Sequence, residues 1–295
     1  MMKKTLCFLC HKNTKPLSMM VDYFSKNKNN RIIIHIDAKS DINEFNDIRQ
    51  GNNVSFLRKR YDITWGGVGM VSATISLLDE ALLNDFDYLF LLSGDDLACM
   101  DEAAIDDVLQ DMGYANLIHF QDERNDYVNP DDRVRYKYPS CFFKKKITYV
   151  DFLFRQVFKL TKSFYINDAY SEFISLGGHF YKGSQWFGLN YKAVSVIVDF
   201  LRRNQWYYAM YKKSLIPDEV FFHTLIKYIG INDVHIDKAK ISDALRYTDW
   251  STGPDYPRTL DISDIEKIKK SGCLFARKFS HETTSSLFEE LLSRH

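Results

Sequence analysis

Two adjacent carboxylates, Asp218 and Glu219, follow Pro217 in the apolar stretch IPDEVFFHTLI, where a helix is predicted to start. Proline suits the first helical turn, because the N–H group that it lacks would have no partner there. The positive end of the helix dipole stabilises anions at this position, which is the simple explanation for both acids. In the alternative explanation, Asp218 caps the helix and apolar neighbours raise the pKa of Glu219 so that it acts as a general base.

A second pair of acids, Asp95 and Asp96, follows the apolar run DYLFLL in a Ser-Gly-Asp-Asp turn. Carboxylates at a strand end are suitable ligands for a divalent metal beside a diphosphate. However, adjacent acids lack the Asp-x-Asp spacing that points both side chains the same way. A turn held by the hydrogen bonds of its own Asp side chains explains the pair equally well. Both interpretations stay open.

Two basic residues are candidates for binding a diphosphate without a metal. Arg258 follows a proline in a polar loop, and Lys278 follows the apolar run CLFA. If the two converge, Arg258 binds the phosphates through bidentate hydrogen bonds and Lys278 adds a point charge. Their separation in the sequence does not show convergence, and solvated surface charges are the simpler account.

The elements that must position these residues alternate between strand and helix over the first hundred residues. KTLCFLC, RIIIHID and DYLFLLS are apolar runs of strand length, and PLSMMVDYFSK and VGMVSATISLLDEALL have helical spacing. This order predicts an α/β fold with a mixed, mainly parallel central sheet. Ligands bind such sheets beyond the carboxyl ends of the strands, where His11, Asp37 and Asp95 fall. No repeat or clear linker appears, so one domain is expected.

Composition excludes several classes of protein. The 295 residues include 39 basic and 39 acidic side chains, which argues against a general nucleic-acid binder. Aromatic residues make up 15%, a content that suits cores and sugar-binding surfaces alike. Five scattered cysteines form no disulfide framework and fit a reducing compartment. The basic N-terminus lacks a secretory signal, and no apolar run is long enough to span a membrane, so a cytoplasmic protein is expected.

The segment of residues 142–166 is both basic and aromatic, with apolar residues near helical spacing. A surface helix packed on the domain is one interpretation. The other is a helix that lies on anionic lipid, at the cytoplasmic face of an inner membrane.

Eight segments, in order and covering residues 7 to 280, resemble one enzyme family. The chain is similar to the core 2/I-branching β-1,6-N-acetylglucosaminyltransferases and the related peptide O-xylosyltransferases of glycosyltransferase family 14. The segments are CHKN, IHIDAKS, ITWGGVGMVSATISLLDEAL, DYLFLLSGDDL, GSQWFGLN, IPDEVFFHTL, LRYTDWSTGPDYPRTL and SGCLFARKFS.

The resemblance implies a GT-A-type, Rossmann-like nucleotide-binding fold, a UDP-sugar donor, inversion at the anomeric carbon and no metal cofactor. It divides residues 1–295 into a nucleotide-binding half, 1–120, and an acceptor-binding and catalytic half, 121–295. The family's paired cysteines and long N-terminal region are missing, so its disulfides are not inherited. The residues carried over are Glu219 as base; His11, Asp37, Arg258 and Lys278 for the donor; and Glu123, Arg133, Trp186, Tyr247 and Trp250 for the acceptor.

The expected reaction moves a sugar, by default N-acetylglucosamine, onto a hydroxyl group of a glycan. A bacterial surface polysaccharide or lipid-linked oligosaccharide is the expected acceptor. Three alternatives remain. A metal-dependent transferase would use Asp95 and Asp96, a non-catalytic carbohydrate-binding protein would bind no UDP, and a glycosidase would need a second carboxylate opposite Glu219.

Overall fold

A five-stranded sheet, in the order β3-β2-β1-β4-β6, forms the centre of the computed structural model, which describes residues 2–48, 51–253 and 256–293. Strand β1 pairs in parallel with β2 and β4, β2 pairs in parallel with β3, and β6 runs antiparallel to β4. The predicted α/β fold with a mixed, mainly parallel sheet is therefore confirmed. The strands are β1 (Lys4–Cys10), β2 (Arg31–Ile36), β3 (Val54–Phe56), β4 (Tyr88–Ser93) and β6 (Gly188–Asn190).

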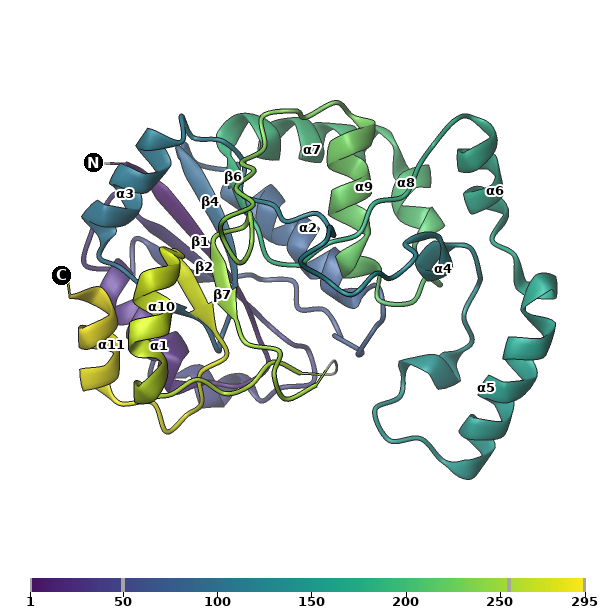
Figure 1. The fold of residues 1–295 in the computed structure, drawn as a ribbon, viewed down its shortest axis with the longest axis horizontal. Helices are drawn as coiled ribbons and strands as arrows, with labels where there is room; N and C mark the ends of the chain where they lie inside the picture. The colour runs from purple at the N-terminus through teal and green to yellow at the C-terminus, as the bar shows by residue number, and fades with distance from the viewer. Residues whose placement is uncertain (1, 49–50, 254–255, 294–295) are drawn as a thin grey trace.

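The sheet is covered on both faces, which is why β1 and β4 are mostly apolar and are buried along their whole length. Successive side chains of a strand point to opposite faces. Leu6 and Phe8 accordingly enter one core, and Cys7 and Leu9 enter the other. Figure 1 shows α1, α10 and α11 on one side of the sheet and α2, α7 and α9 on the other.

The helices predicted in PLSMMVDYFSK and VGMVSATISLLDEALL are α1 and α2. Helix α1 begins at a Thr14 cap, whose side chain accepts the N–H of Leu17. The α-helices are α1 (Lys15–Phe24), α2 (Gly69–Ala81), α3 (Glu102–Asp111), α4 (Asp131–Val134), α5 (Tyr149–Thr161), α6 (Asp168–Ser175), α7 (Tyr191–Arg203), α8 (Gln205–Met210), α9 (Phe221–Tyr228), α10 (Ile265–Ser271) and α11 (Ser285–Leu292). Short 3₁₀ turns are η1 (Ile42–Phe45), η2 (Ser140–Phe143), η3 (Lys162–Tyr165), η4 (Pro217–Glu219) and η5 (Ile262–Asp264).

A second, three-stranded sheet brings the C-terminal part of the chain to the end of β4. Its order is β5-β8-β7, with β5 (Leu97–Ala98) antiparallel and β7 (Arg246–Thr248) parallel to β8 (Phe275–Arg277). The N–H of Phe279 donates to the carbonyl of Asp95 at 2.9 Å. Residues that follow β8 therefore lie beside the turn that follows β4.

The segment 142–166, called the arm below, extends away from the central sheet (Figure 1). The predicted helix is confirmed for its middle, α5, which begins with a capping box of Thr148 and Asp151. The expectation that this helix packs on the domain is wrong for most of its surface. Only Asp151 and Phe158 of α5 are buried, because the rest of the helix has no neighbouring element to cover it.

Candidate active site

Glu219 lies between two cationic side chains. Its Oε2 atom is 3.5 Å from Nη2 of Arg133 and 3.2 Å from Nζ of Lys182. The Glu219 side chain keeps 30% of its surface exposed. Among the described residues, Oε2 has ion-pair partners but no hydrogen-bond partner. Oε2 itself is buried, so the exposed surface belongs to the rest of the Glu219 side chain.

The turn that carries Glu219 corrects the prediction that Pro217 and the two acids start an α-helix. They form the 3₁₀ turn η4 instead, and α9 begins only after Val220. The chain enters η4 through Ile216, whose φ of 50° is left-handed and whose N–H donates to the carbonyl of Gly66 at 2.7 Å. This tertiary hydrogen bond sets the direction of the turn and holds Glu219 at the surface.

Gly183 fixes the backbone of Glu219 from the other side, since its N–H donates to the Glu219 carbonyl at 2.9 Å. A Cβ atom at Gly183 would lie 1.8 Å from the carbonyl oxygen of His119 and 2.4 Å from Nε2 of His223. Only glycine permits this approach. Burial lowers the pKa of His223 to about 3, so its neutral ring can donate Nε2–H to the His119 carbonyl, 3.1 Å away.

Asp218 does not have the capping role expected of it. The turn η4 has no hydrogen bond from a capping side chain. Burial, with a further contribution from the charge of Glu219, raises the pKa of Asp218 to about 7. Asp218 is therefore an acid with a raised pKa at this turn, a property that the sequence analysis did not assign to it.

Arg258 and Lys278 line one cavity, of about 550 Å³. Arg258 is held by two carboxylates: its Nε lies 2.8 Å from Oδ2 of Asp249, and its Nη2 contacts Asp264. Nζ of Lys278 lies 5.8 Å from the ring centroid of Tyr256, and no described carboxylate is within ion-pair distance of it. The two predicted cations thus converge, and Lys278 is the one left free to bind an anion.

His11, Asp37 and Asp95 lie at the carboxyl ends of β1, β2 and β4, as expected from the strand order. The N–H of Asp37 donates to the carbonyl of Cys10 at 2.8 Å, which joins the ends of β1 and β2. Burial and the charge of Asp96 raise the pKa of Asp95, while Lys278 and His11 act in the opposite direction. The donor-side candidates are therefore near one another at this edge of the sheet.

Asp96 is occupied by structural contacts. It is fully buried, its carboxylate accepts the N–H of Ser93 at 2.9 Å, and it contacts the buried guanidinium of Arg246. This agrees with the interpretation of the Ser-Gly-Asp-Asp turn as a structural turn. Within the described ranges, no three His, Cys, Asp or Glu side chains form a group arranged to hold a metal.

Trp186 connects the Glu219 side of the site with the Lys278 side. The guanidinium of Arg277, next to Lys278 in the chain, lies 4.5 Å from the centroid of the Trp186 ring. Lys182, which contacts Glu219, is four residues before Trp186, so their Cα atoms are at most about 14 Å apart. The Trp186 ring is only 8% exposed, which leaves little area to stack on an acceptor sugar. Its observed contact is with Arg277.

The other predicted acceptor residues are not gathered around Glu219. Glu123 forms a surface ion pair with Lys238. Burial raises the pKa of Tyr247, with contributions from Asp249 and Asp264, which places Tyr247 near the Arg258 group. Trp250 is exposed in the loop after β7. Pro254 and Asp255 of the same loop lie outside the described residues.

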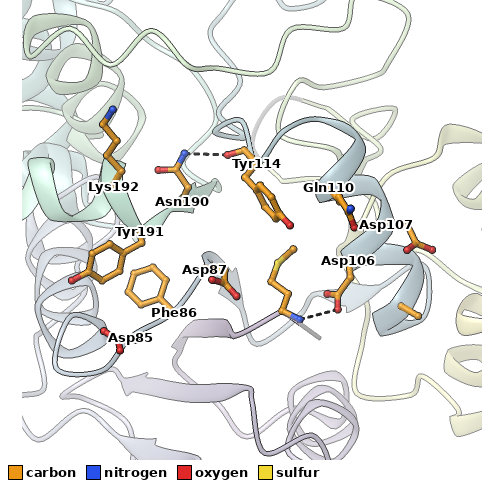
Figure 2. A pocket seen from close by; sticks show the side chains of 12 residues that line it. Asp85, Phe86, Asp87, Asp106, Asp107, Gln110, Tyr114, Asn190, Tyr191 and Lys192 are labelled. Atoms are coloured by element: carbon orange, nitrogen blue, oxygen red, sulfur yellow. Dashed lines mark hydrogen bonds between the residues drawn. The ribbon is translucent and has the colours of Figure 1, made fainter.

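A larger cavity, of about 1040 Å³, lies at the opposite edge of the sheet, where β1 and β4 begin (Figure 2). Among the described residues of its lining, four are aspartates and one, Lys192, is basic. Such a surface would repel a diphosphate, and it is at the wrong end of the strands for a nucleotide. Lining residues include Asp85, Asp87, Asp106 and Asp107.

Sequence reasoning missed two residues of this site. Lys182 lies in the recognised stretch GGHFYKGSQWFGLN, but a single lysine beside a glycine gives no signal of its contact with Glu219. Arg246 lies in LRYTDW and looks like a surface charge, although the structure buries it against Asp96. Asp96, an acid at the end of a buried strand, was the available signal for Arg246, because a buried carboxylate requires a cation.

Known proteins resemble this chain to different degrees. A family model described as "Branch: Core-2/I-Branching enzyme" matches residues 6–270. The "Beta-glucuronosyltransferase GlcAT14A" of Arabidopsis thaliana is 25% identical over 296 positions, which cover 90% of this chain and 59% of that protein. The chain thus spans about three fifths of this curated relative. The crystal structure of mannose-1-phosphate geranyltransferase from Thermus thermophilus aligns with a TM-score of 0.31 and 13% identity, covering 74% of this chain and 71% of that one.

Proposed function

The chain belongs to the Core-2/I-branching enzyme family, and from this premise we propose that it is an inverting glycosyltransferase that moves a sugar from a UDP-sugar to a hydroxyl group of a glycan. The observation that carries the proposal is the convergence of Arg258 and Lys278 on one cavity, linked through Arg277 and Trp186 to the side of the site that holds Glu219. We propose that the donor binds at the strand ends of residues 1–120 and at these two cations. The acceptor then binds to the remainder of residues 121–295.

Glu219 is the proposed base. Its carboxylate, on a side chain that is 30% exposed, accepts the proton of the acceptor hydroxyl as the hydroxyl oxygen attacks the anomeric carbon from the face opposite UDP. Arg133 and Lys182 hold the carboxylate in place. A single displacement of this kind needs one carboxylate, whereas a glycosidase needs two.

Negative charge grows on the diphosphate as the bond to the sugar breaks. A fixed cation at that point lowers the barrier because it stabilises charge that exists only in the transition state. Lys278 supplies this cation directly. Arg258 supplies a second one if the diphosphate replaces part of its contact with Asp249 and Asp264.

We propose that transfer requires no divalent metal. This is supported by the commitment of Asp96 to Arg246 and Ser93, which leaves Asp95 as the carboxylate of the turn that faces the donor cations. The test is the transfer rate after dialysis against EDTA. An unchanged rate supports the proposal, and a loss restored by Mn²⁺ or Mg²⁺ establishes the Asp95 alternative.

UDP-N-acetylglucosamine is the first candidate donor, and UDP-glucuronic acid is the second because the relative from Arabidopsis is named a glucuronosyltransferase. A surface polysaccharide or lipid-linked oligosaccharide is the proposed acceptor. We place the reaction in the cytoplasm, which suits five free and buried cysteines.

Thermal-shift measurements with UDP, UDP-N-acetylglucosamine, UDP-glucuronic acid and GDP-mannose test this function, since a ligand that binds the native state raises its stability. A shift with UDP and one UDP-sugar, followed by transfer of that sugar, is the expected result. Binding of glycan without any UDP-dependent shift would instead identify a carbohydrate-binding protein.

A further inference from the structure

Helix α5 presents an apolar face to solvent. Tyr149, Leu153, Val157 and Leu160 recur at intervals of four, four and three residues, so they share one side of the helix. All four are exposed, and Leu160 is 86% exposed. Phe164 in the following turn η3 is 86% exposed as well. Contiguous apolar surface of this kind marks an interaction site on a protein.

The opposite side of α5 is firmly attached, so the outward face has a defined direction. Phe158 is 5% exposed, and its ring centroid lies 5.3 Å from that of Tyr138 and 5.0 Å from that of Phe142. Nη2 of Arg155 donates to the carbonyl of Cys141 at 2.7 Å. The apolar residues of the outward face are therefore not needed to hold the helix in place.

The arm is also strongly basic, although the whole chain carries equal numbers of acidic and basic residues. Its one acid, Asp151, is buried and paired with Lys144 at 2.7 Å. Exposed cations thus lie in the same segment as the apolar face, without exposed anions among them. The basic residues of the arm are Lys144, Lys145, Lys146, Arg155, Lys159 and Lys162.

We propose that the arm binds the surface of an anionic phospholipid bilayer. In this arrangement α5 lies in the plane of the interface, with its apolar face among the acyl chains and its cations at the headgroups. The positive charge of the arm indicates which partner covers its apolar face. A second copy of the chain would cover the apolar face but bring two cationic arms together, whereas anionic lipid satisfies both features. No described helix combines the length and apolarity needed to span the bilayer.

The arm connects directly to the Glu219 side of the site. The N–H of Lys137 donates to the Tyr165 carbonyl at 2.7 Å, and the N–H of Asn167 donates to the Arg135 carbonyl at 2.9 Å. These bonds tie the C-terminal end of the arm to the chain beside α4, which carries Arg133. A bilayer bound at the arm therefore lies on the acceptor side. This last step rests on the proposed function and favours a lipid-linked acceptor.

Flotation of the whole chain with vesicles tests the proposal. Vesicles of phosphatidylcholine alone are compared with vesicles that also contain phosphatidylglycerol. Leu160→Ser should weaken binding about tenfold, because it removes one apolar side chain that the bilayer would bury. Its control is Leu83→Ser, which removes another exposed leucine, 70% exposed, from the loop after α2. Lys145→Gln with Lys146→Gln should weaken binding about 25-fold, at roughly fivefold per charge; Lys26→Gln with Lys28→Gln is the matched control.

Binding that requires phosphatidylglycerol and falls only in the two arm variants supports the proposal. Absence of vesicle binding overturns it, as does binding that all four variants retain equally. Concentration-dependent dimerisation that Leu160→Ser abolishes would also overturn it, in favour of a second copy. UDP binding by thermal shift should be unchanged in every variant, so failure of the membrane proposal and failure of the glycosyltransferase proposal give different results.

Discussion

The Glu219 and Arg258 groups have opposite charge balances. At Glu219 one carboxylate is faced by two cations, Arg133 and Lys182. At Arg258 one cation is held by two carboxylates, Asp249 and Asp264, and Lys278 nearby stays unpaired within the described residues. The comparison teaches that an ion pair on its own does not identify a catalytic group. What separates the two groups is which polar atom lacks a partner among the described residues: Oε2 of Glu219 has no hydrogen bond, and Nζ of Lys278 has no carboxylate within ion-pair distance.

The largest effect is expected from Glu219→Gln. The amide keeps the size of the side chain but cannot take a proton, so transfer should fall about 1000-fold, within the usual range for a general base. UDP binding should stay unchanged, since Glu219 does not line the Lys278 cavity. Steady-state transfer rates and UDP titration measure the two properties. Glu266→Gln, on the exposed side of α10, is the control, and near-normal transfer by Glu219→Gln would end the assignment.

Lys278→Ala should have the next largest effect. Loss of a charged hydrogen bond should weaken UDP binding on the order of 30-fold, while uridine binding changes little. Calorimetric titration with UDP and uridine compares the two ligands directly, and Lys267→Ala provides a lysine outside the cavity as control. Equal weakening of both ligands would contradict a role at the diphosphate.

Arg258→Ala should affect UDP less than Lys278→Ala does, because Arg258 already has two carboxylate partners. UDP binding should still weaken more than uridine binding. The change should also lower the free energy of unfolding by about 2 kcal/mol, because it leaves the carboxylate of Asp264, which is 2% exposed, without its cation. Urea unfolding measures this loss. If Arg258→Ala left the stability unchanged and weakened UDP binding more than Lys278→Ala does, Arg258 and not Lys278 would be the main cation for the diphosphate.

The smallest effect on transfer and UDP binding is expected at Asp218, whose prediction concerns the pH dependence of stability. Its folded-state pKa, raised to about 7, means that the native state binds more protons than the unfolded state between about pH 4 and pH 7. The contribution of Asp218 to stability should therefore fall as pH rises through this window, by roughly 1.4 kcal/mol for each pH unit that separates the folded-state and unfolded-state pKa values. Asp218→Asn should remove this dependence. Urea unfolding at about pH 5 and about pH 8 measures this change in the free energy of unfolding. An equal change in the unmodified protein and in Asp218→Asn would show that Asp218 is not the group responsible.

The same apolar spacing had different outcomes in different parts of the chain. In α1 and α2 the apolar positions of a helical pattern point into the core, as the sequence predicts. In α5 a comparable pattern points to solvent. Periodicity specifies that a helix has an apolar side, but the element that covers this side is a property of the tertiary fold.

The sequence by itself determined the strand and helix order of the first half and the parallel sheet, because β-branched and helical patterns are local properties. It also placed His11, Asp37 and Asp95 at strand ends. Only the tertiary structure decided that Pro217 begins a 3₁₀ turn and that Lys182 meets Glu219. It alone shows that Asp96 forms a buried ion pair with Arg246. Each of these outcomes depends on a contact between segments far apart in the chain, and charge and burial at such contacts are set by the folded geometry, which no local pattern encodes.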